Sequence, residues 1–146
     1  AHPELGNNAQ LAQLLGMTIK GEIEPLLPWG ELSMPVSGLE LASWIEARLG
    51  RKPLWCGDTG PEKVARVAWC TGGGQSFIDS AARFGVDAFI TGEVSEQTIH
   101  SAREQSLHFY AAGHHATERG GIRALSEWLT ENTDLDVTFI DIPNPA

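Results

Sequence analysis

Strand-like and helix-like segments alternate from Val64 onward, and this alternation constrains the fold of the chain more than any other feature. Each short apolar run is followed by a turn and then by a stretch with helical periodicity, which is typical of strand–helix units. Such units predict an α/β fold with a mostly parallel sheet and helices on both faces. The expected strands span residues 64–70, 88–91, 107–112 and 137–142, and the expected helices span residues 76–84, 95–104 and 117–129, the last with Ile122, Leu125 and Leu129 buried.

Three of the turns between these strands and helices read TGGGQS, TGE and GHHATE. The carboxyl ends of parallel strands meet at one edge of a sheet, and ligands of α/β proteins usually bind at that edge. If the strands that begin near Val64, Ala88 and Leu107 are parallel neighbours, the three turns line a single crevice. We therefore expect the functional side chains in these turns.

The first part of the chain predicts a helix followed by strands. Asn7 and Asn8 are suitable N-cap residues for a helix whose apolar positions repeat at helical spacing and which stops at Gly16. Residues 17–36 contain three prolines between short alternating apolar pieces. This pattern indicates one or two strands joined by turns.

A second helix is expected directly after these strands. Ser37 and Glu40 have the spacing of a capping box, and the periodic stretch that they open ends at Gly50. The proline-rich segment before this helix also indicates a domain boundary. We interpret residues 1–30 as the end of a preceding α/β unit with its linker, and residues 31–146 as a C-terminal α/β domain.

His114 and Glu118 are the strongest candidates for a metal site. They lie four residues apart where a strand runs through Gly113 into a helix, so their side chains are expected on one face of the helix. A neutral imidazole and a carboxylate are common ligands at hydrolytic and redox metal sites. The alternative is a solvated helix start in which Glu118 faces the positive end of the helix dipole. Two ligands do not close a site, so further donors must come from elsewhere.

The TGGGQS turn has two interpretations. Its backbone amides at Gly73 and Gly74, with Ser76 at the start of a helix, could contact an anionic substrate. The spacing matches neither a dinucleotide fingerprint nor a Walker loop. The alternative is a tight turn that needs glycines only for unusual dihedral angles, with Ser76 as the helix N-cap.

Glu93 directly follows an expected strand and faces the proposed crevice. A carboxylate in this place could act as a general base in catalysis or could hold a metal-binding histidine in position. The alternative is an acidic residue in the first turn of a helix that serves only the helix dipole.

Composition restricts the classes of function. The chain is 42% hydrophobic and 20% charged, as in an ordinary soluble globular protein, and it contains no apolar stretch of membrane-spanning length. Its net charge of −9 argues against nucleic-acid partners, which require clustered Lys and Arg. Cys56 and Cys70 are isolated, so we expect no disulfide framework and a cytoplasmic location. The tryptophans are expected in the core or in subunit contacts.

Three segments together, GGGQSFIDSA, GVDAFITGE and GHHATE, resemble the family of GTP cyclohydrolase I type 2 homologues. The resemblance runs along the whole chain, from AHPELGNNAQ to FIDIPNPA, but it covers only the later and larger part of the family's full-length protein. It implies two similar α/β units in each full-length subunit, assembly as a toroidal homohexamer, and a dinuclear metal centre between the two halves of each subunit.

The resemblance also assigns metal ligands. In the family, the His and the Glu of a G-H-x-x-[ST]-E motif bind metal, and these positions match His114 and Glu118. The second position of the motif varies, so His115 is not assigned as a ligand. The other family ligands are a His pair in the first half and an Asp just ahead of the position of Ala1, none of which this chain contains. The chain is therefore expected to hold at most half of a site.

The resemblance implies a metal-dependent hydrolase that acts on a nucleotide-like small molecule. The expected cofactors are two divalent transition metal ions for each full-length subunit, and ligation by His and carboxylate suits Zn, Fe, Mn or Ni. The alternative is a non-enzymatic assembly protein in which the metal is structural or stored. Open metal positions would favour the enzyme, whereas complete ligation by protein would favour the alternative.

Overall fold

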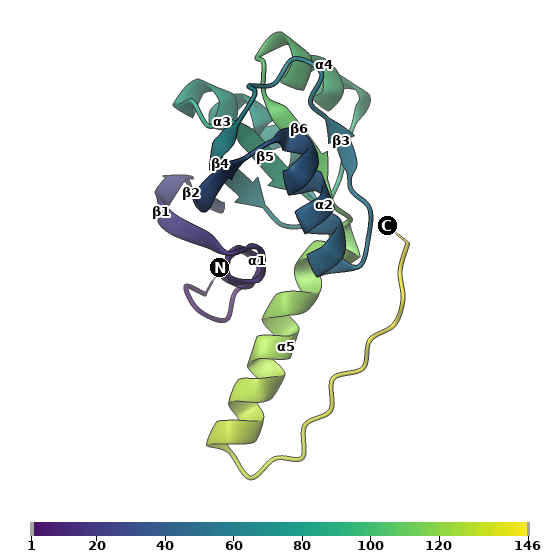
Figure 1. Cartoon of the computed structure of the whole chain (residues 1–146). Helices are drawn as coiled ribbons and strands as arrows, with labels where there is room; N and C mark the ends of the chain where they lie inside the picture. The colour runs from purple at the N-terminus through teal and green to yellow at the C-terminus, as the bar shows by residue number, and fades with distance from the viewer. Residues whose placement is uncertain (1, 146) are drawn as a thin grey trace.

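This computed structural model describes residues 2–145. The centre of the fold is a six-stranded sheet (Figure 1). The strands lie in the order β1-β2-β4-β5-β6-β3. Their bounds are Met17–Glu24 for β1, Leu27–Val36 for β2, Leu54–Cys56 for β3, Val64–Cys70 for β4, Ala88–Thr91 for β5 and His108–Ala111 for β6. The helices are α1 (Asn7–Leu15), α2 (Gly38–Leu49), α3 (Ile78–Phe84), α4 (Glu96–Glu104) and α5 (His114–Asn132), with a 3-10 turn, η1 (Gln75–Phe77), before α3.

The centre of the sheet is parallel, as the alternation of strands and helices predicts. β4 pairs in parallel with β5, and β5 pairs in parallel with β6. The other pairings, β1 with β2, β2 with β4 and β3 with β6, are antiparallel. The mixed α/β class is thus confirmed, with the parallel strands confined to the centre. Residue 30 lies within β2, and both β1 and β2 are strands of this sheet. The domain boundary expected after residue 30 stays a prediction.

Hydrophobic cores lie on both faces of the sheet, which confirms that helices cover both sides. Alternate residues of β4 serve the two faces: Val67 and Trp69 point to one core, and Ala68 and Cys70 point to the other. The first core includes residues from α1 and α2, namely Leu11, Leu15, Leu41, Ile45 and Leu49. The second includes residues from α3, from α4 and from β5 and β6, namely Ile78, Ala81, Ala102, Phe89 and Phe109.

The capping box predicted for the second helix is present. The Ser37 hydroxyl accepts a hydrogen bond from the Glu40 backbone amide at 3.2 Å, and the Glu40 carboxylate accepts one from the Ser37 amide at 2.7 Å. These bonds satisfy amides that have no partner within the helix. The helix ends at Gly50, as predicted.

The N-caps predicted at Asn7 and Asn8 are wrong, although the helix does stop at Gly16. Gly6 is the N-cap, and both asparagines lie inside α1. Their side chains bind other segments instead. Asn7 Oδ1 accepts a hydrogen bond from the Gly121 amide, and Asn8 Oδ1 accepts one from the Thr71 amide, each at 2.9 Å. The two residues therefore attach α1 to α5 and to the turn after β4.

The role of N-cap predicted for Ser76 is also wrong. Ser76 lies within η1, and the α-helix begins two residues later, at Ile78. Neither η1 nor α3 has a side-chain cap, and Ser76 is exposed. The turn after β4 instead continues directly into 3-10 geometry, a common way to begin a helix.

The C-terminal part of the chain departs most from the prediction. Residues 137–142 form no strand, and they run beside α5 without joining the sheet (Figure 1). α5 begins at His114 rather than at Thr117, and its buried residues are Thr117 and Ala124. Ile122 and Leu125 are 52% and 38% exposed, and Leu129 is half-buried. The expected burial fails because the second half of α5 extends beyond the sheet, where no other described layer covers its apolar side chains.

Two further properties concern the described residues as a whole. Cys56 and Cys70 are free and buried, so they form no disulfide with each other. Among residues 2–145, no helix combines the length and the apolar character that crossing a membrane requires.

Candidate metal centre

The three turns that the sequence assigns to one crevice do meet at the carboxyl edge of the parallel strands. The Gly92 amide donates to the carbonyl of Gly72, and the Gly113 amide donates to the carbonyl of Gly92, each at 2.9 Å. These bonds link the turn after β4 to the turn after β5, and the latter to the start of α5. The parallel pairing therefore places the candidate residues of all three turns side by side.

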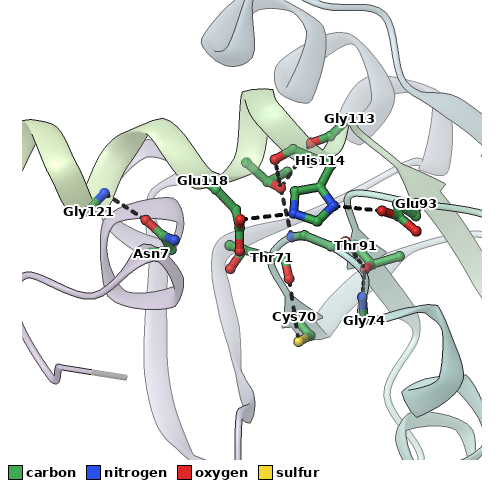
Figure 2. A network of polar contacts seen from close by, with 12 residues as sticks. Asn7, Cys70, Thr71, Gly74, Thr91, Glu93, Gly113, His114, Glu118 and Gly121 are labelled. Atoms are coloured by element: carbon green, nitrogen blue, oxygen red, sulfur yellow. Dashed lines mark hydrogen bonds and ion pairs between the residues drawn. The ribbon is translucent and has the colours of Figure 1, made fainter. Parts of the chain in front are cut away.

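His114 and Glu118 converge, as their spacing predicts (Figure 2). His114 is the first residue of α5, and Gly113 before it has φ 98° and ψ 129°, a conformation that a residue with a side chain rarely adopts. His114 Nε2 lies 3.0 Å from Glu118 Oε2 across one helical turn. Both side chains are partly exposed, at 43% and 38%, so a solvated ion can reach their donor atoms.

Glu93 contacts the other nitrogen of the same imidazole. Its Oε1 lies 2.6 Å from His114 Nδ1, and its Oε2 accepts a hydrogen bond from Gln75 Nε2 at 3.3 Å. The contact with His114 holds the pKa of Glu93 below its ordinary value. The same contact raises the pKa of His114. Burial opposes this shift only in part, and the charge of Glu118 adds to it. Figure 2 shows the two carboxylates on opposite sides of the ring.

Gly72 leaves the space that this pair occupies, although no local pattern distinguishes it from the other glycines of the turn. A Cβ at Gly72 would lie 2.7 Å from Glu118 Oε1 and 3.1 Å from His114 Nε2. The φ of Gly72 is 68°, in the left-handed region that favours glycine. The glycine run alone could not show which of its members approaches the acidic side chain, because that approach depends on the position of α5.

Two buried threonines, Thr91 and Thr117, hold the turns together, and neither was predicted as a site residue. Thr117 Oγ1 accepts from the Gly72 amide at 3.0 Å and donates to the carbonyl of Gly113 at 2.9 Å. Thr91 Oγ1 accepts from the Gly74 amide at 3.0 Å and donates to the carbonyl of Gly72 at 3.1 Å. Because both side chains are buried, these bonds fix the turn relative to α5 without competition from water. The only sequence signal is a threonine at the end of β5 and one in the first turn of α5.

The anion contacts expected at Gly73, Gly74 and Ser76 stay a prediction that this geometry does not favour. Thr91 already uses the Gly74 amide, and Thr117 uses that of Gly72. Gly73 is exposed, but a Cβ there would lie 3.5 Å from Glu93 Oε2, so its surroundings are negatively charged. An anion at this turn would be repelled by Glu93.

The His115 side chain contacts the C-terminal segment instead of Glu93 or Glu118. Its Nε2 lies 3.2 Å from Asp141 Oδ1 in the C-terminal segment. Within residues 2–145, no three His, Cys, Asp or Glu side chains are arranged to hold one metal ion together. Among these residues, His114 and Glu118 thus offer only a partial set of ligands, since zinc usually has three or four protein ligands.

Two cavities border this site, and Glu118 lines both of them. One has a volume of about 900 Å³ and is lined by Glu93, His114 and Glu118 together with the far half of α5 and residues 137–144. The other has a volume of about 610 Å³ and is lined by Glu118, Thr71 and residues of the N-terminal segment, including His2. Glu118 therefore borders space on both sides that could hold further ligands or a small molecule.

The sequence and the fold both match a known family. Residues 1–145 match the family Duf34/NIF3 (NGG1p interacting factor 3), and the chain belongs to it. A relative from Salmonella typhimurium, named GTP cyclohydrolase 1 type 2 homolog, is 93% identical over 146 residues, which cover 100% of this chain and 59% of the relative. The chain thus spans about three fifths of the length of this relative.

Solved structures give the same result. A structure described as protein ybgI of unknown function has a TM-score of 0.99 and 92% identity, and it covers 100% of this chain and 59% of its own. The structure of TTHA1606 from Thermus thermophilus has a TM-score of 0.86 and 27% identity, with 100% of this chain and 58% of that chain covered. The family resemblance inferred from the three motifs is therefore confirmed.

Proposed function

We propose that this chain supplies part of a metal centre, with His114 and Glu118 as ligands. The observation that carries the proposal is the contact of 2.6 Å between Glu93 and His114 Nδ1. Metal-binding histidines almost always donate their second ring N–H to a carboxylate or carbonyl, which fixes the tautomer and leaves the other nitrogen for the metal. In this arrangement Nε2 is the ligand atom, and Nε2 faces Glu118.

The donor set fits a divalent transition metal ion but does not complete its ligation. One imidazole nitrogen and one carboxylate suit Zn, Fe, Mn or Ni, whereas a catalytic zinc ion usually has three protein ligands. The Salmonella relative contains about two fifths more of its own length outside the match, which could supply the missing donors. The cavity beside Glu118 that His2 lines would admit them. We therefore propose a dinuclear centre in the full-length protein, meaning this chain joined to the part that the longer relatives carry.

The proposed reaction is hydrolysis of a nucleotide-like small molecule, as the name of the Salmonella relative suggests. A pair of bound metal ions would supply Lewis acidity and lower the pKa of water. The residues of this chain have separate tasks: His114 and Glu118 hold metal, Glu93 orients His114, and Gln75 holds Glu93. The cavity of about 900 Å³ next to these residues has the size of a small-molecule site.

Metal analysis followed by a hydrolysis screen tests this proposal. Purified full-length protein should contain close to two equivalents of transition metal per subunit. It should release product from at least one member of a panel of purine and pyrimidine nucleotides, and the variant His114→Ala should lose that activity. Full-length protein that binds no transition metal would contradict the proposal. Full-length protein that binds metal but hydrolyses no nucleotide of the panel would favour the non-enzymatic alternative.

A second candidate function is assembly with structural or stored metal, in a homohexameric ring. Apolar side chains on the surface favour self-association: Leu54 and Trp55 on the edge strand β3 are 47% and 38% exposed, and Met34 and Leu39 are 62% and 61% exposed. Light scattering of the full-length protein should give a mass well above that of one subunit. A monomer at micromolar concentration would exclude the ring.

The free cysteines suit a reducing compartment, and we propose a cytoplasmic location.

A further inference from the structure

The C-terminal segment, residues 137–142, has the chemistry of a strand but no partner. Its sequence is VTFIDI, in which every residue except Asp141 is β-branched or aromatic. One side faces α5: Phe139 lies against the Arg123 guanidinium at 4.8 Å, and Asp141 bonds to Arg119 at 3.0 Å. The opposite side is open, and Ile140 and Ile142 on it are 76% and 72% exposed. Successive side chains of this segment thus alternate between two sides, as they do in a β-strand.

The backbone of this segment is also unpaired. No backbone hydrogen bond joins residues 137–142 to any other residue among those described. Side chains alone hold the segment: Asp141 contacts His115, Arg119 and Arg123, and these contacts outweigh partial burial and lower the pKa of Asp141. An apolar run with open amides and carbonyls on both sides is a template for strand pairing.

Next to this segment, no other part of the described chain packs over the apolar residues in the second half of α5. Ile122, Leu125 and Trp128 are 52%, 38% and 46% exposed. The cavity of about 900 Å³ lies between this half of the helix and the C-terminal segment, and both line it. Figure 1 shows the segment running back along α5. A helix, a short loop and a strand form an αβ unit, and such a unit normally packs its helix on the sheet to which its strand belongs.

We propose that residues 137–142 pair as a strand with the sheet of a second α/β unit, and that α5 covers that sheet. The unit is the part of the full-length protein outside this chain, because the chain covers only 59% of the Salmonella relative. Apart from Asp141, which pairs with His115, Arg119 and Arg123, the run has apolar or β-branched residues on both sides, which suits a strand covered on both faces in an α/β sheet. The proposal is independent of the metal, since none of these residues is a proposed ligand.

A second copy of this chain is a poorer partner for the segment. The sheet has two edge strands among the described residues, β1 and β3. β3 spans only Leu54–Cys56, which is too short for a strand of residues 137–142. β1 has register irregularities after Ile19 and after Glu22, and bulged edges discourage pairing with another chain.

Hydrogen exchange of the full-length protein tests the pairing directly. Amides of residues 137–142 should exchange at least about 100-fold more slowly than those of an unstructured peptide, because a paired strand opens only with its sheet. Exchange at the unstructured rate throughout the segment would overturn the proposal. Protection that disappears on dilution together with the oligomer would identify a second copy as the partner and would also overturn it.

Proline variants separate pairing of the backbone from burial of side chains. Successive amides of a strand point to opposite sides, so at least one of Phe139→Pro and Ile140→Pro should remove a ladder hydrogen bond. That variant should lose protection across residues 137–142. The control Ile140→Val keeps the amide and the branched side chain, and it should retain the protection. If neither proline changes the exchange, the segment does not pair as proposed.

Discussion

Glu93 and Glu118 contact opposite nitrogens of the same imidazole, that of His114, at 2.6 and 3.0 Å. With a carboxylate at each nitrogen, the doubly protonated ring satisfies both contacts, which agrees with the raised pKa of His114. Nε2 can bind either a proton or a metal ion. The hydrogen bond from Nδ1 to Glu93 can form in both of these states. We therefore interpret Glu93 as the residue that positions His114 for ligation.

Loss of the Glu93 carboxylate should weaken metal binding without unfolding the protein. The side chain is 45% exposed, so it contributes little to packing. In full-length protein, Glu93→Ala should lower metal affinity by about 10–100-fold, the usual effect of losing such a partner, and Glu93→Gln should lower it less because an amide oxygen still accepts from Nδ1. A competition titration with a chelator measures the affinity. Equal affinity in all three proteins would show that Glu93 does not position the ligand.

The His114–Glu93 pair should make stability depend on pH in a defined direction. The pKa of His114 is raised from 6.5, so its contribution is fully present below that value and is lost as pH rises through the higher folded pKa. The pKa of Glu93 is lowered from 4.5, so its contribution is present above that value and is lost as pH falls through the lower folded pKa. The pair should therefore stabilise the metal-free protein most between these two ordinary values.

An NMR titration of the His114 ring in metal-free, full-length protein measures this shift. The pKa should lie above the ordinary value of 6.5, and Glu93→Gln should bring it down towards that value, because the largest cause of the shift is removed. A His114 pKa that does not respond to Glu93→Gln would show that the contact is absent in solution.

A methyl group at Gly72 should destabilise the protein, whereas one at Gly73 should be tolerated. At Gly72 the φ is 68° and a Cβ would lie 2.7 Å from Glu118 Oε1. Gly72→Ala should reduce the free energy of unfolding by about 1–3 kcal/mol and displace Glu118. At Gly73, where a Cβ makes only ordinary contacts, the first at 3.5 Å, the matched variant Gly73→Ala should change it by less than about 0.5 kcal/mol. Urea unfolding compares the two, and equal losses would contradict the role of Gly72.

Thr117 should stabilise the site through its buried hydroxyl. Thr117→Val keeps the shape of the side chain but leaves the Gly72 amide without its partner, which should cost about 1–3 kcal/mol. Thr130→Val is the control, because Thr130 makes a similar bond to the carbonyl four residues earlier but is exposed. Thermal unfolding should show a clear loss for the first variant and little change for the second. A similar midpoint for both would mean that the hydroxyl of Thr117 does not hold the turn.

Patterns in the sequence are sufficient where residues interact with near neighbours, or where strands alternate regularly with helices. The capping box at Ser37 and Glu40 forms as predicted, because its bonds span three residues. The parallel pairing of β4, β5 and β6 follows from the regular alternation of strands with helices. The convergence of His114 and Glu118 follows from helical spacing alone.

Features that depend on distant segments could not be predicted in this way. Asn7 has the chemistry of an N-cap, but its side chain binds Gly121, which is 114 residues away along the chain. Thr91 and Thr117 satisfy buried amides of the glycine turn, and nothing local distinguishes them from other threonines. The strand expected at residues 137–142 is absent for the same kind of reason, since a strand forms only where a partner supplies its hydrogen bonds.

The metal content of full-length protein carrying His114→Ala, beside the control His115→Ala, tests the central claim most directly. His114 points its Nε2 to Glu118, whereas His115 points to Asp141, so the two adjacent histidines differ in the role proposed for them. We predict that His114→Ala loses most of its bound transition metal while its circular dichroism spectrum is unchanged, and that His115→Ala keeps its metal. A full complement of metal in folded His114→Ala protein would contradict the account.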